Sequence, residues 1–326
     1  MQTRQTTFKI IDHDLIQLNN NLKKMVGAKH PILYAAAEHL FNAGGKRIRP
    51  SIVLLISKAT INNSVIEALL PEHKRLAEIT EIIHTASLVH DDVIDDCETR
   101  RGIDTVHNKF NTKVAILAGD FLFAQSSWYL ANLNNIEVVK TISKVITDFA
   151  EGEVRQGMIH FDYTISIDNY IEKSFYKTAS LIAAACQGAV MLSQCNKITQ
   201  YQLYLYGKHL GLAFQIIDDI LDIISCSETL GKPAGSDLNN GNLTAPLFFA
   251  LEEQKILCQF INREFQKNDD VKTTIHIIKN TNGIQKAKDL AEEHIQIAQY
   301  IIHQLNPNEA TKNLLLVNNY IINRLN

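Results

Sequence analysis

Residues 214–222 read FQIIDDILD, and residues 87–95 read SLVHDDVID. Each segment sets two aspartates side by side and a third four positions after the first, within an otherwise apolar run. On a helix, residues four apart lie on one face, one turn from each other. The repeated pattern therefore predicts two acidic helices, and we expect them to face each other around a bound cation.

The apolar surroundings distinguish these motifs from solvated acidic helix ends, where like charges at this spacing cost only ~0.2–0.5 kcal/mol. Two partly buried carboxylates ~6 Å apart repel by roughly 3 kcal/mol at an effective dielectric near 20, and both lose hydration. A divalent cation offsets this cost, and carboxylate oxygens suit Mg2+ that also bridges to phosphate. The predicted metal ligands are Asp91, Asp92, Asp95, Asp218, Asp219 and Asp222.

Helical periodicity runs through almost all of the 326 residues, and we find no segment that alternates as a strand does. All six prolines fall between periodic segments, where they do not interrupt a helix. The hydrophobic fraction of 46% supports a sizeable core. We therefore expect an all-α fold, a single large helical-bundle domain over residues 1–326. The predicted helices cover residues 12–28, 31–43, 50–60, 72–96, 112–133, 135–160, 168–195, 198–225, 244–265, 282–305 and 309–325.

Composition excludes several classes of partner and compartment. A net charge of -3 argues against nucleic acid as the main partner, because phosphate neutralisation requires a basic face. The five cysteines contain no CxxC pair, which indicates a reducing compartment without a disulfide framework or zinc site. We see no signal peptide at the start of the chain. The longest apolar stretch, residues 181–192, is shorter than the ~20 residues of a bilayer span, so we expect a core helix and no transmembrane segment.

Basic residues accompany the acidic motifs. Residues 44–50 read GGKRIRP and place three cations behind two glycines, just ahead of a helix. Glycines let the backbone approach a bulky anion, while a helix N-terminus and guanidinium groups stabilise phosphate charge. The polar loop at residues 225–242 is long enough to be a lid over a site. More cations stand here than one phosphate needs, which predicts two phosphorylated substrates. The other cations are Arg100, Arg101, Lys177 and Lys232.

In combination and in this order, the motifs resemble the trans-isoprenyl diphosphate synthases over nearly the whole chain. The resemblance rests on GGKRIRP at 44–50, HTASLVHDDVIDDCETRRG at 84–102, Lys177 with Thr178, FQIIDDILD at 214–222 and GKP at 231–233. The segments HPILYAAAEHLFNAGGKRIRP, LAGDFLFAQSSWYLANL and GKPAGSDLNNGNLTAP look most like cyanobacterial and plastid-encoded prenyl transferases of the solanesyl diphosphate synthase kind. The resemblance implies the all-α isoprenoid synthase fold with a central substrate cavity.

The resemblance also implies a head-to-tail condensation of isopentenyl diphosphate with an allylic diphosphate held by Mg2+ on the aspartates. Such a reaction needs charge stabilisation and positioning but no protein nucleophile. It assigns the allylic diphosphate to Arg100, Lys177 and Lys232, with Thr178 and Gln215 beside it to stabilise the developing cation through oxygen dipoles. It assigns isopentenyl diphosphate to Lys46, Arg49, His84 and Arg101.

His84 and Gln215 are site candidates through the motifs alone, and position 242 differs from the family pattern. By themselves, His84 and Gln215 are typical of packed core residues, and only their place in the motifs makes them site candidates. The chain departs from the family pattern at Asn242, where many members carry a lysine. One diphosphate contact is therefore missing or supplied elsewhere.

Product length follows from the residues four and five before the first aspartate, which line the elongation tunnel in this family. Large aromatic residues there stop growth early, whereas this chain has Ser87 and Ala86. One helical turn is ~5.4 Å, similar to one isoprene unit, so small residues move the floor of the tunnel deeper. We expect a product longer than 20 carbons, of about 40 to 50 carbons, for the side chain of plastoquinone or a related quinone.

Two other functions are weighed against this one. A terpene cyclase also ionises a metal-bound allylic diphosphate but needs one diphosphate site, so GGKRIRP and Arg101 weigh against it. A non-catalytic subunit of a heteromeric prenyl synthase generally loses aspartates, and both motifs here are complete.

The resemblance extends to assembly and location. Members of the family are usually homodimers, and the apolar segment 112–133 is the expected interface. The frequent isoleucine, asparagine and lysine, without a transit peptide, suit an AT-rich organelle genome. We expect a plastid stroma, with a bacterial cytoplasm as the alternative, and transient membrane contact when the apolar product leaves.

Overall fold

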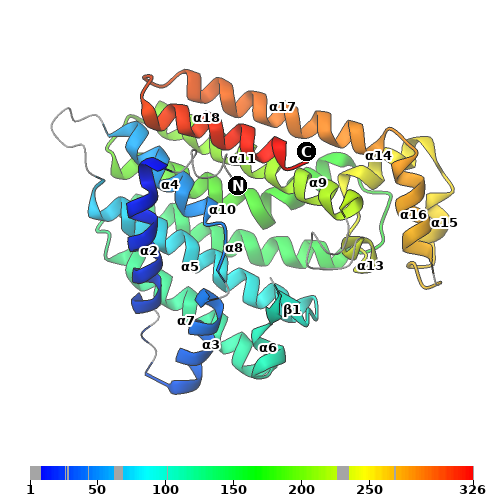
Figure 1. The fold of residues 1–326 in the computed structure, drawn as a ribbon, viewed down its shortest axis with the longest axis horizontal. Coiled ribbons are helices and arrows are strands. Elements are labelled where there is room, and N and C mark those ends of the chain that lie inside the picture. Colours follow the sequence, from blue (N-terminus) through cyan, green and yellow to red (C-terminus); the bar gives the residue numbers. More distant parts are fainter. Residues whose placement is uncertain are drawn as a thin grey trace. The chain divides into compact units, whose positions relative to one another are not determined.

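The computed structural model describes residues 9–25, 27, 29–42, 44–61, 69–100, 102–225, 235–267 and 269–325 (Figure 1). The chain divides into two compact units, each discontinuous in sequence. Unit 1 comprises Met1–Ile146, Leu181–Gly207 and Ile301–Val317, and unit 2 comprises Thr147–Ser180, Lys208–Tyr300 and Asn318–Asn326. Both units consist mainly of helices, which confirms the predicted all-α fold. The single domain over residues 1–326 stays a prediction.

Unit 1 is arranged around α5 (Pro71–Ile94), whose side chains are buried on nearly all sides. A helix buried on most of its faces requires neighbours around it, and its buried polar side chains require hydrogen-bond partners. Helices α2, α4 and α7 pack against α5, and α10 reaches it where a ring nitrogen of His73 lies 3.1 Å from the carbonyl of Ala189. The elements that begin in unit 1 are η1 (Lys9–Ile11), α2 (Asp12–Met25), α3 (Pro31–Asn42), α4 (Ile48–Thr60), α5, β1 (Thr99–Arg100), β2 (Ile103–Asp104), α6 (Val106–Lys109), α7 (Thr112–Ala131), α8 (Ile136–Met158) and α11 (Lys197–Ile224).

Unit 2 contains the second half of α11 and the helices that pack around it. Ser166 opens α9 with a capping box, its side chain accepting from the backbone N–H of Asn169. The ring of Tyr170 on α9 lies 6.3 Å from that of Phe248 on α14. The remaining elements are α9 (Ile167–Ser174), η2 (Phe175–Ala179), α10 (Ser180–Leu192), α13 (Ser236–Asn239), α14 (Ala245–Glu253), α15 (Leu257–Asn262), α16 (Asp270–Lys279), α17 (Gly283–His303), α18 (Glu309–Ile322) and η3 (Asn323–Leu325), of which most of α10 and most of α18 lie in unit 1.

Several predicted boundaries were wrong. The chain forms a two-residue antiparallel ladder between β1 and β2, in a region predicted to have no strand. The predicted helix 244–265 is broken between α14 and α15, and α16 was not predicted at all. The predicted helix 168–195 contains η2, a π-helical turn, at Phe175–Ala179. The lid loop 225–242 contains the short helix α13 in its described part, while residues 226–234 lie outside the described residues.

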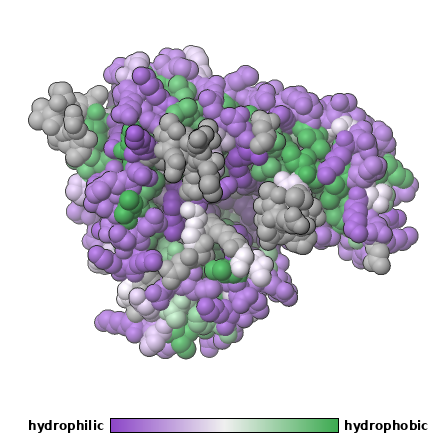
Figure 2. Space-filling model, in the orientation of Figure 1, coloured by the Kyte–Doolittle hydropathy of each residue, from purple (hydrophilic) through white to green (hydrophobic). Residues whose placement is uncertain are grey.

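Two helical segments are long and apolar enough to cross a membrane by length and composition alone: Thr112–Ala131, 33% buried over its apolar window, and Ile167–Leu192, 72% buried. In the second, Ala183, Cys186 and Ala189 are fully buried, which confirms a core helix at 181–192. On the face drawn in Figure 2, hydrophilic residues predominate and apolar ones form small groups between them. Four described cysteines are free thiols, and Cys226 lies outside the described residues.

Candidate active site

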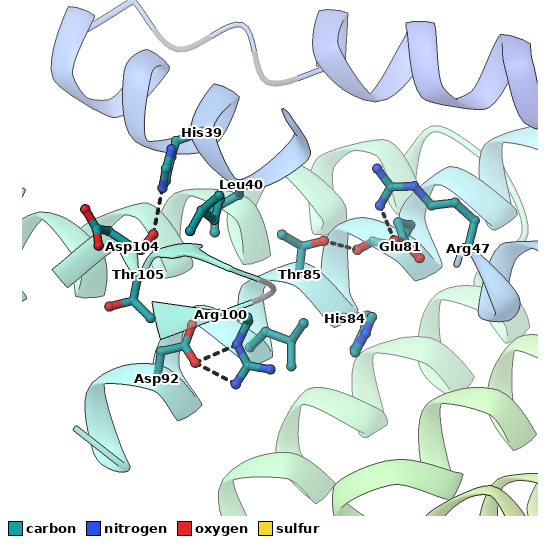
Figure 3. Close-up of a pocket in the computed structure, with 12 residues that line it drawn as sticks. His39, Leu40, Arg47, Glu81, His84, Thr85, Asp92, Arg100, Asp104 and Thr105 are labelled. Carbon is teal, nitrogen blue, oxygen red and sulfur yellow. Dashed lines mark hydrogen bonds and ion pairs between the residues drawn. The ribbon is translucent and has the colours of Figure 1, made fainter. Parts of the chain in front are cut away.

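The turn before α4 carries the GGKRIRP cations in unit 1. Gly44 and Arg47 both have left-handed backbone conformations, with φ of 69° and 50°. Arg47 points inward: its guanidinium forms an ion pair with Glu81 of α5, and its Nε donates to Asn19 Oδ1 at 3.0 Å (Figure 3). Arg47 therefore fastens the turn to α2 and α5, while Lys46 is exposed.

Arg49 and His84, two predicted ligands of isopentenyl diphosphate, are brought together by α4 and α5. Arg49 Nη1 lies 3.0 Å from His84 Nε2. A guanidinium only donates, so Nε2 accepts and the imidazole carries its proton on Nδ1. His84 lines a pocket together with Asp92 and Arg100 (Figure 3). Within unit 1, this pocket is also lined by Arg47 and by the carboxylates of Glu81 and Asp104.

The first aspartate motif lies at the C-terminal end of α5. Asp92 is buried, with 3% of its surface exposed, while Asp91 and Asp95 are half-buried. Asp92 Oδ1 accepts from Arg100 Nε at 2.6 Å and lies 2.5 Å from Arg100 Nη2. Burial alone would lower the pKa of Arg100, but the hydrogen bond to Asp92 and the nearby Asp91 raise it above its usual value. Arg100 is thus a permanent cation fixed on the middle aspartate.

The two predicted chain-length residues lie one turn before this motif. The Ala86 side chain is fully buried, and Ser87 is half-buried with its hydroxyl donating to the carbonyl of His84 at 3.0 Å. Both side chains are small, and both belong to the helix that carries the first aspartates.

In unit 2, the π-helical turn η2 carries Lys177 and Thr178. Turns of this type are rare and occur often at functional sites. Lys177 Nζ lies 2.9 Å from Glu153 Oε1 and 3.4 Å from Gln156 Oε1, both on α8. Helix α8 therefore supplies a carboxylate partner for Lys177.

A chain of hydrogen bonds links Thr178 to the second aspartate motif. Thr178 Oγ1 donates to Gln215 Oε1 at 2.6 Å, and Gln215 Nε2 donates to Asp219 Oδ1 at 2.7 Å. Tyr170 Oη donates to Asp219 Oδ2 at 2.6 Å. Burial raises the pKa of Asp219 to about 7, and the charge of Asp237 adds to this effect. The arrangement fixes both oxygens of the middle aspartate.

The outer aspartates of the second motif have different partners. Asp218, 37% exposed, lies 2.5 Å from Arg324 Nη2, and the Arg324 guanidinium stacks over Phe214 at 4.6 Å. Asp222 is buried, and its carboxylate accepts from the Ser236 hydroxyl at 3.1 Å and from the Asp237 N–H at 3.3 Å. Asp222 therefore anchors α13, the described part of the predicted lid.

The donor set fits a hard divalent cation. Asp91, Asp95 and Asp218 are partly exposed carboxylates, and oxygen-only donors are those that Mg2+ prefers. Within the described ranges, no three His, Cys, Asp or Glu side chains are already grouped at metal-binding distances. Substrate phosphate oxygens and water would complete the coordination, as Mg2+ sites usually require.

The site also contains residues that sequence reasoning missed. Glu81 forms an ion pair with Arg47, Tyr170 donates to Asp219, and Arg324 forms an ion pair with Asp218. Lys173, which donates to Asn242, lies four residues before the predicted Lys177. An acidic residue in the middle of the apolar run before the first motif was a signal for Glu81, but Tyr170 and Arg324 had none. Arg101 and Lys232, with Gly231 and Pro233, lie outside the described residues.

Comparison with known proteins places these features in a family. The polyprenyl synthetase family model matches residues 30–278. A prenyl transferase of Porphyra purpurea is 59% identical over 325 residues, which cover 100% of both chains. A chloroplastic solanesyl-diphosphate synthase 2 of Oryza sativa subsp. japonica is 52% identical over 290 residues, 89% of this chain and 72% of that one.

Among solved structures, the fold is similar to a polyprenyl synthase from Caulobacter crescentus complexed with calcium and isoprenyl diphosphate. The TM-score is 0.90 at 29% sequence identity, covering 98% of this chain and 97% of that one. That relative binds a divalent cation and a prenyl diphosphate, the two ligands that the carboxylates and cations described above suit chemically.

Proposed function

Because the chain belongs to the polyprenyl synthetase family and is a prenyltransferase, we propose that it builds a long all-trans prenyl chain by adding isopentenyl diphosphate head-to-tail to an allylic diphosphate. One observation supports this most: there are two separate cationic groups, Arg49 with His84 in unit 1 and Lys177 in unit 2. Two diphosphates need two such groups, whereas a terpene cyclase needs one.

Mg2+ is the proposed cofactor, held by Asp91, Asp95 and Asp218 and supported by Asp92, Asp219 and Asp222. It supplies the charge that makes the allylic diphosphate a leaving group. Asp92 and Asp219 accept hydrogen bonds from Arg100, Gln215 and Tyr170, so these residues fix the motifs rather than move during the reaction.

The remaining residues bind and orient substrate. Arg49, His84, Lys46 and Arg101 are proposed to hold isopentenyl diphosphate, and Arg100, Lys177 and Lys232 the allylic diphosphate. The Thr178 hydroxyl donates a hydrogen bond to Gln215. The lone pairs of Thr178 Oγ1 can therefore point to an adjacent carbocation and stabilise it. Attack of the isopentenyl double bond leaves a carbocation, and the released diphosphate takes a proton from it to give the new allylic product.

A product of about 45 carbons is proposed from the small Ala86 and Ser87, which leave the first turn of the tunnel open. The rice relative is named a chloroplastic solanesyl-diphosphate synthase, and this name supports a plastid stromal enzyme that supplies the side chain of plastoquinone or a related quinone. A bacterial cytoplasm is the alternative location.

Incubation with labelled isopentenyl diphosphate, an allylic primer and Mg2+, followed by chromatography of the dephosphorylated products, tests the proposal. We expect a ladder that ends near 45 carbons. A cyclised product formed without consumption of isopentenyl diphosphate would indicate a terpene cyclase. No turnover alone, with activity appearing only beside a second subunit, would indicate a non-catalytic partner.

A further inference from the structure

A second lysine of unit 2 lies one turn before Lys177, in a position that the proposed function has not used. Lys173 is in the last turn of α9 and is buried, with 8% of its surface exposed. Its ammonium donates to Oδ1 of Asn242. Asn242 is the position at which the chain departs from the lysine that many relatives carry.

The backbone at Gly241 and Asn242 is held in place by two hydrogen bonds. The backbone N–H of Asn242 donates to the carbonyl of Asp237 at 2.8 Å. The preceding Gly241 has φ of 69°, and its carbonyl accepts from the N–H of Phe161 at 3.0 Å. A Cβ on Gly241 would come within 2.6 Å of the Phe161 ring, so only glycine fits the turn. This backbone positions the Asn242 side chain, and its amide oxygen then directs the Lys173 ammonium.

The hydrogen-bond partner of this buried cation is neutral. Among the described residues, no carboxylate forms an ion pair with Lys173. Burial lowers the pKa of Lys173 and the charge of Lys177 adds to this effect, while the more distant Asp219, Asp237 and Glu153 oppose it only in part. Asp219 already accepts from Tyr170 and Gln215. A buried ammonium on a neutral amide keeps its charge available for an anion, which would offset its desolvation.

We propose that Lys173 is a further diphosphate-binding residue: with Lys177, it provides a pair of ammonium groups for the allylic diphosphate, and Asn242 orients it. Asn242, where the resemblance leads us to expect a lysine, then contributes an amide that orients Lys173. This inference rests on the proposed function, because it names a ligand of the same allylic site.

Exchange of the two side chains tests this. We expect Lys173→Gln to raise KM for farnesyl diphosphate about tenfold, the loss of one charge-assisted hydrogen bond, and to leave KM for isopentenyl diphosphate within about twofold. The double variant Lys173→Gln/Asn242→Lys returns the charge and is expected to recover KM to within about threefold of the wild type. Lys272→Gln, which changes an exposed lysine of the same unit, is the control and keeps both constants.

Thermal unfolding of each variant separates loss of fold from loss of ligand. An unchanged KM for farnesyl diphosphate in Lys173→Gln overturns the inference while the proposed function stands. If Lys173→Gln does not fold, the double variant Lys173→Gln/Asn242→Lys decides. A KM for farnesyl diphosphate about tenfold above that of the wild type assigns Lys173 to packing alone, and so does a double variant that still does not fold. A wild-type protein that adds no isopentenyl diphosphate to farnesyl diphosphate would instead contradict the proposed function.

Discussion

The six aspartates of the two motifs are of two kinds. Asp91, Asp95 and Asp218 are partly exposed, and Asp218 forms an ion pair with Arg324, whereas the other three are buried. Asp92 is held by Arg100, Asp219 by Tyr170 and Gln215, and Asp222 by the start of α13. We infer that the exposed carboxylates meet the metal and the buried ones keep the motifs rigid.

The substitution Tyr170→Phe tests whether the buried aspartates keep the motifs rigid. Burial and the charge of Asp219 raise the pKa of Tyr170, so its phenol keeps the proton that it donates. Removal of the hydroxyl leaves the ring against Phe248 but takes one donor from Asp219. We expect the Mg2+ concentration for half-maximal activity to rise about tenfold. Tyr300→Phe, at an exposed tyrosine, is the control; equal Mg2+ curves for the two variants would contradict the prediction.

Ala86→Phe tests the product length. Ala86 has no exposed surface and lies one turn before the first aspartate. If this part of α5 lines the proposed tunnel, a phenyl ring here blocks the path of the growing prenyl chain. We expect the product ladder to end at about 15 to 20 carbons, two or more isoprene units earlier than in the wild type. The chromatogram of the dephosphorylated products measures this directly, and an unchanged ladder would exclude Ala86 from the tunnel wall.

At this scale the sequence predicts what is local. The four-residue spacing placed five of the six aspartates on the correct helices, while Asp95 lies just after the end of α5. The order of motifs predicted that Arg49 and His84 lie in one site, and their side chains are 3.0 Å apart. Tyr170 lies 49 positions from Asp219, and Arg324 is further still from Asp218 in sequence. Such contacts depend on the packing of helices, so no pattern in the sequence marks them.

Helix boundaries show the same limit among the elements. The predicted helix 244–265 ends early at Glu253 although no glycine or proline follows, and packing of Leu257 and Ile261 starts a new helix. Helix α16 is rich in valine, threonine and isoleucine, which favour helices weakly. Periodicity is therefore reliable for long helices such as α5 and α11, but tertiary contacts decide the short ones.

Gly207→Ala tests close packing between α11 and α10. A Cβ on Gly207 would come within 2.7 Å of the Ala183 Cα and of the Ile182 carbonyl, and backbone atoms cannot yield as a flexible side chain does. We expect a loss of about 1 to 3 kcal/mol in the free energy of unfolding. Gly157→Ala is the matched control, because its Cβ meets nothing within 4 Å, and it should stabilise by about 0.5 kcal/mol. Urea unfolding would contradict the prediction if both variants shifted alike.

A pair of histidines links α11 to α17 and gives the protein an acid-sensitive contact. His209 Nδ1 lies 2.9 Å from His294 Nδ1, so one ring donates and the other accepts while both are neutral. Burial, with a smaller contribution from the charge of Lys208, lowers the pKa of each to about 4, and His209 contributes to the lowering at His294. Folded pKa values below the unfolded value of 6.5 mean that this stability is complete above about pH 6.5 and is lost as the pH falls towards 4.

Between pH 7 and pH 4, we expect protonation of this histidine pair to reduce the free energy of unfolding by about 2 kcal/mol. This is less than the full pKa shifts imply, because both rings are partly exposed. The double variant His209→Gln/His294→Gln should show a correspondingly flatter dependence of urea unfolding on pH. His303→Gln, at an exposed histidine, should keep the wild-type slope. Parallel slopes in all three proteins would show that the pair does not titrate in this range.

For the whole molecule, the all-α architecture was predictable because helical periodicity covers almost the entire chain. Assembly is a separate matter. Helix α7 exposes Ile116, Leu117 and Trp128, with 43%, 47% and 62% of their surfaces accessible. These side chains lie in the segment 112–133 expected to form a homodimer interface, and burial against a second copy would remove them from water.

Leu117→Glu tests this assembly. The wild type should elute in size-exclusion chromatography with light scattering at twice 36.7 kDa, and the variant at 36.7 kDa, because a buried carboxylate without a partner opposes association. Ile297→Glu changes an exposed apolar residue of α17 and should keep the dimer. A wild type that elutes as a monomer, or a variant that stays dimeric, would contradict the prediction.

The discontinuity of the two units affects how the protein is made. Unit 1 needs Ile301–Val317 as well as the first 146 residues, and unit 2 needs Asn318–Asn326 as well as residues made much earlier. A ribosome that adds about 5 to 20 residues per second takes roughly 8 to 31 s to pass from residue 146 to residue 301. Helix α4 waits for this last segment, since the side chain of Asn308 donates to the carbonyl of Ala59 at 3.4 Å. Neither unit can complete its packing in sequence order, so both reach their full set of contacts only when translation is almost finished.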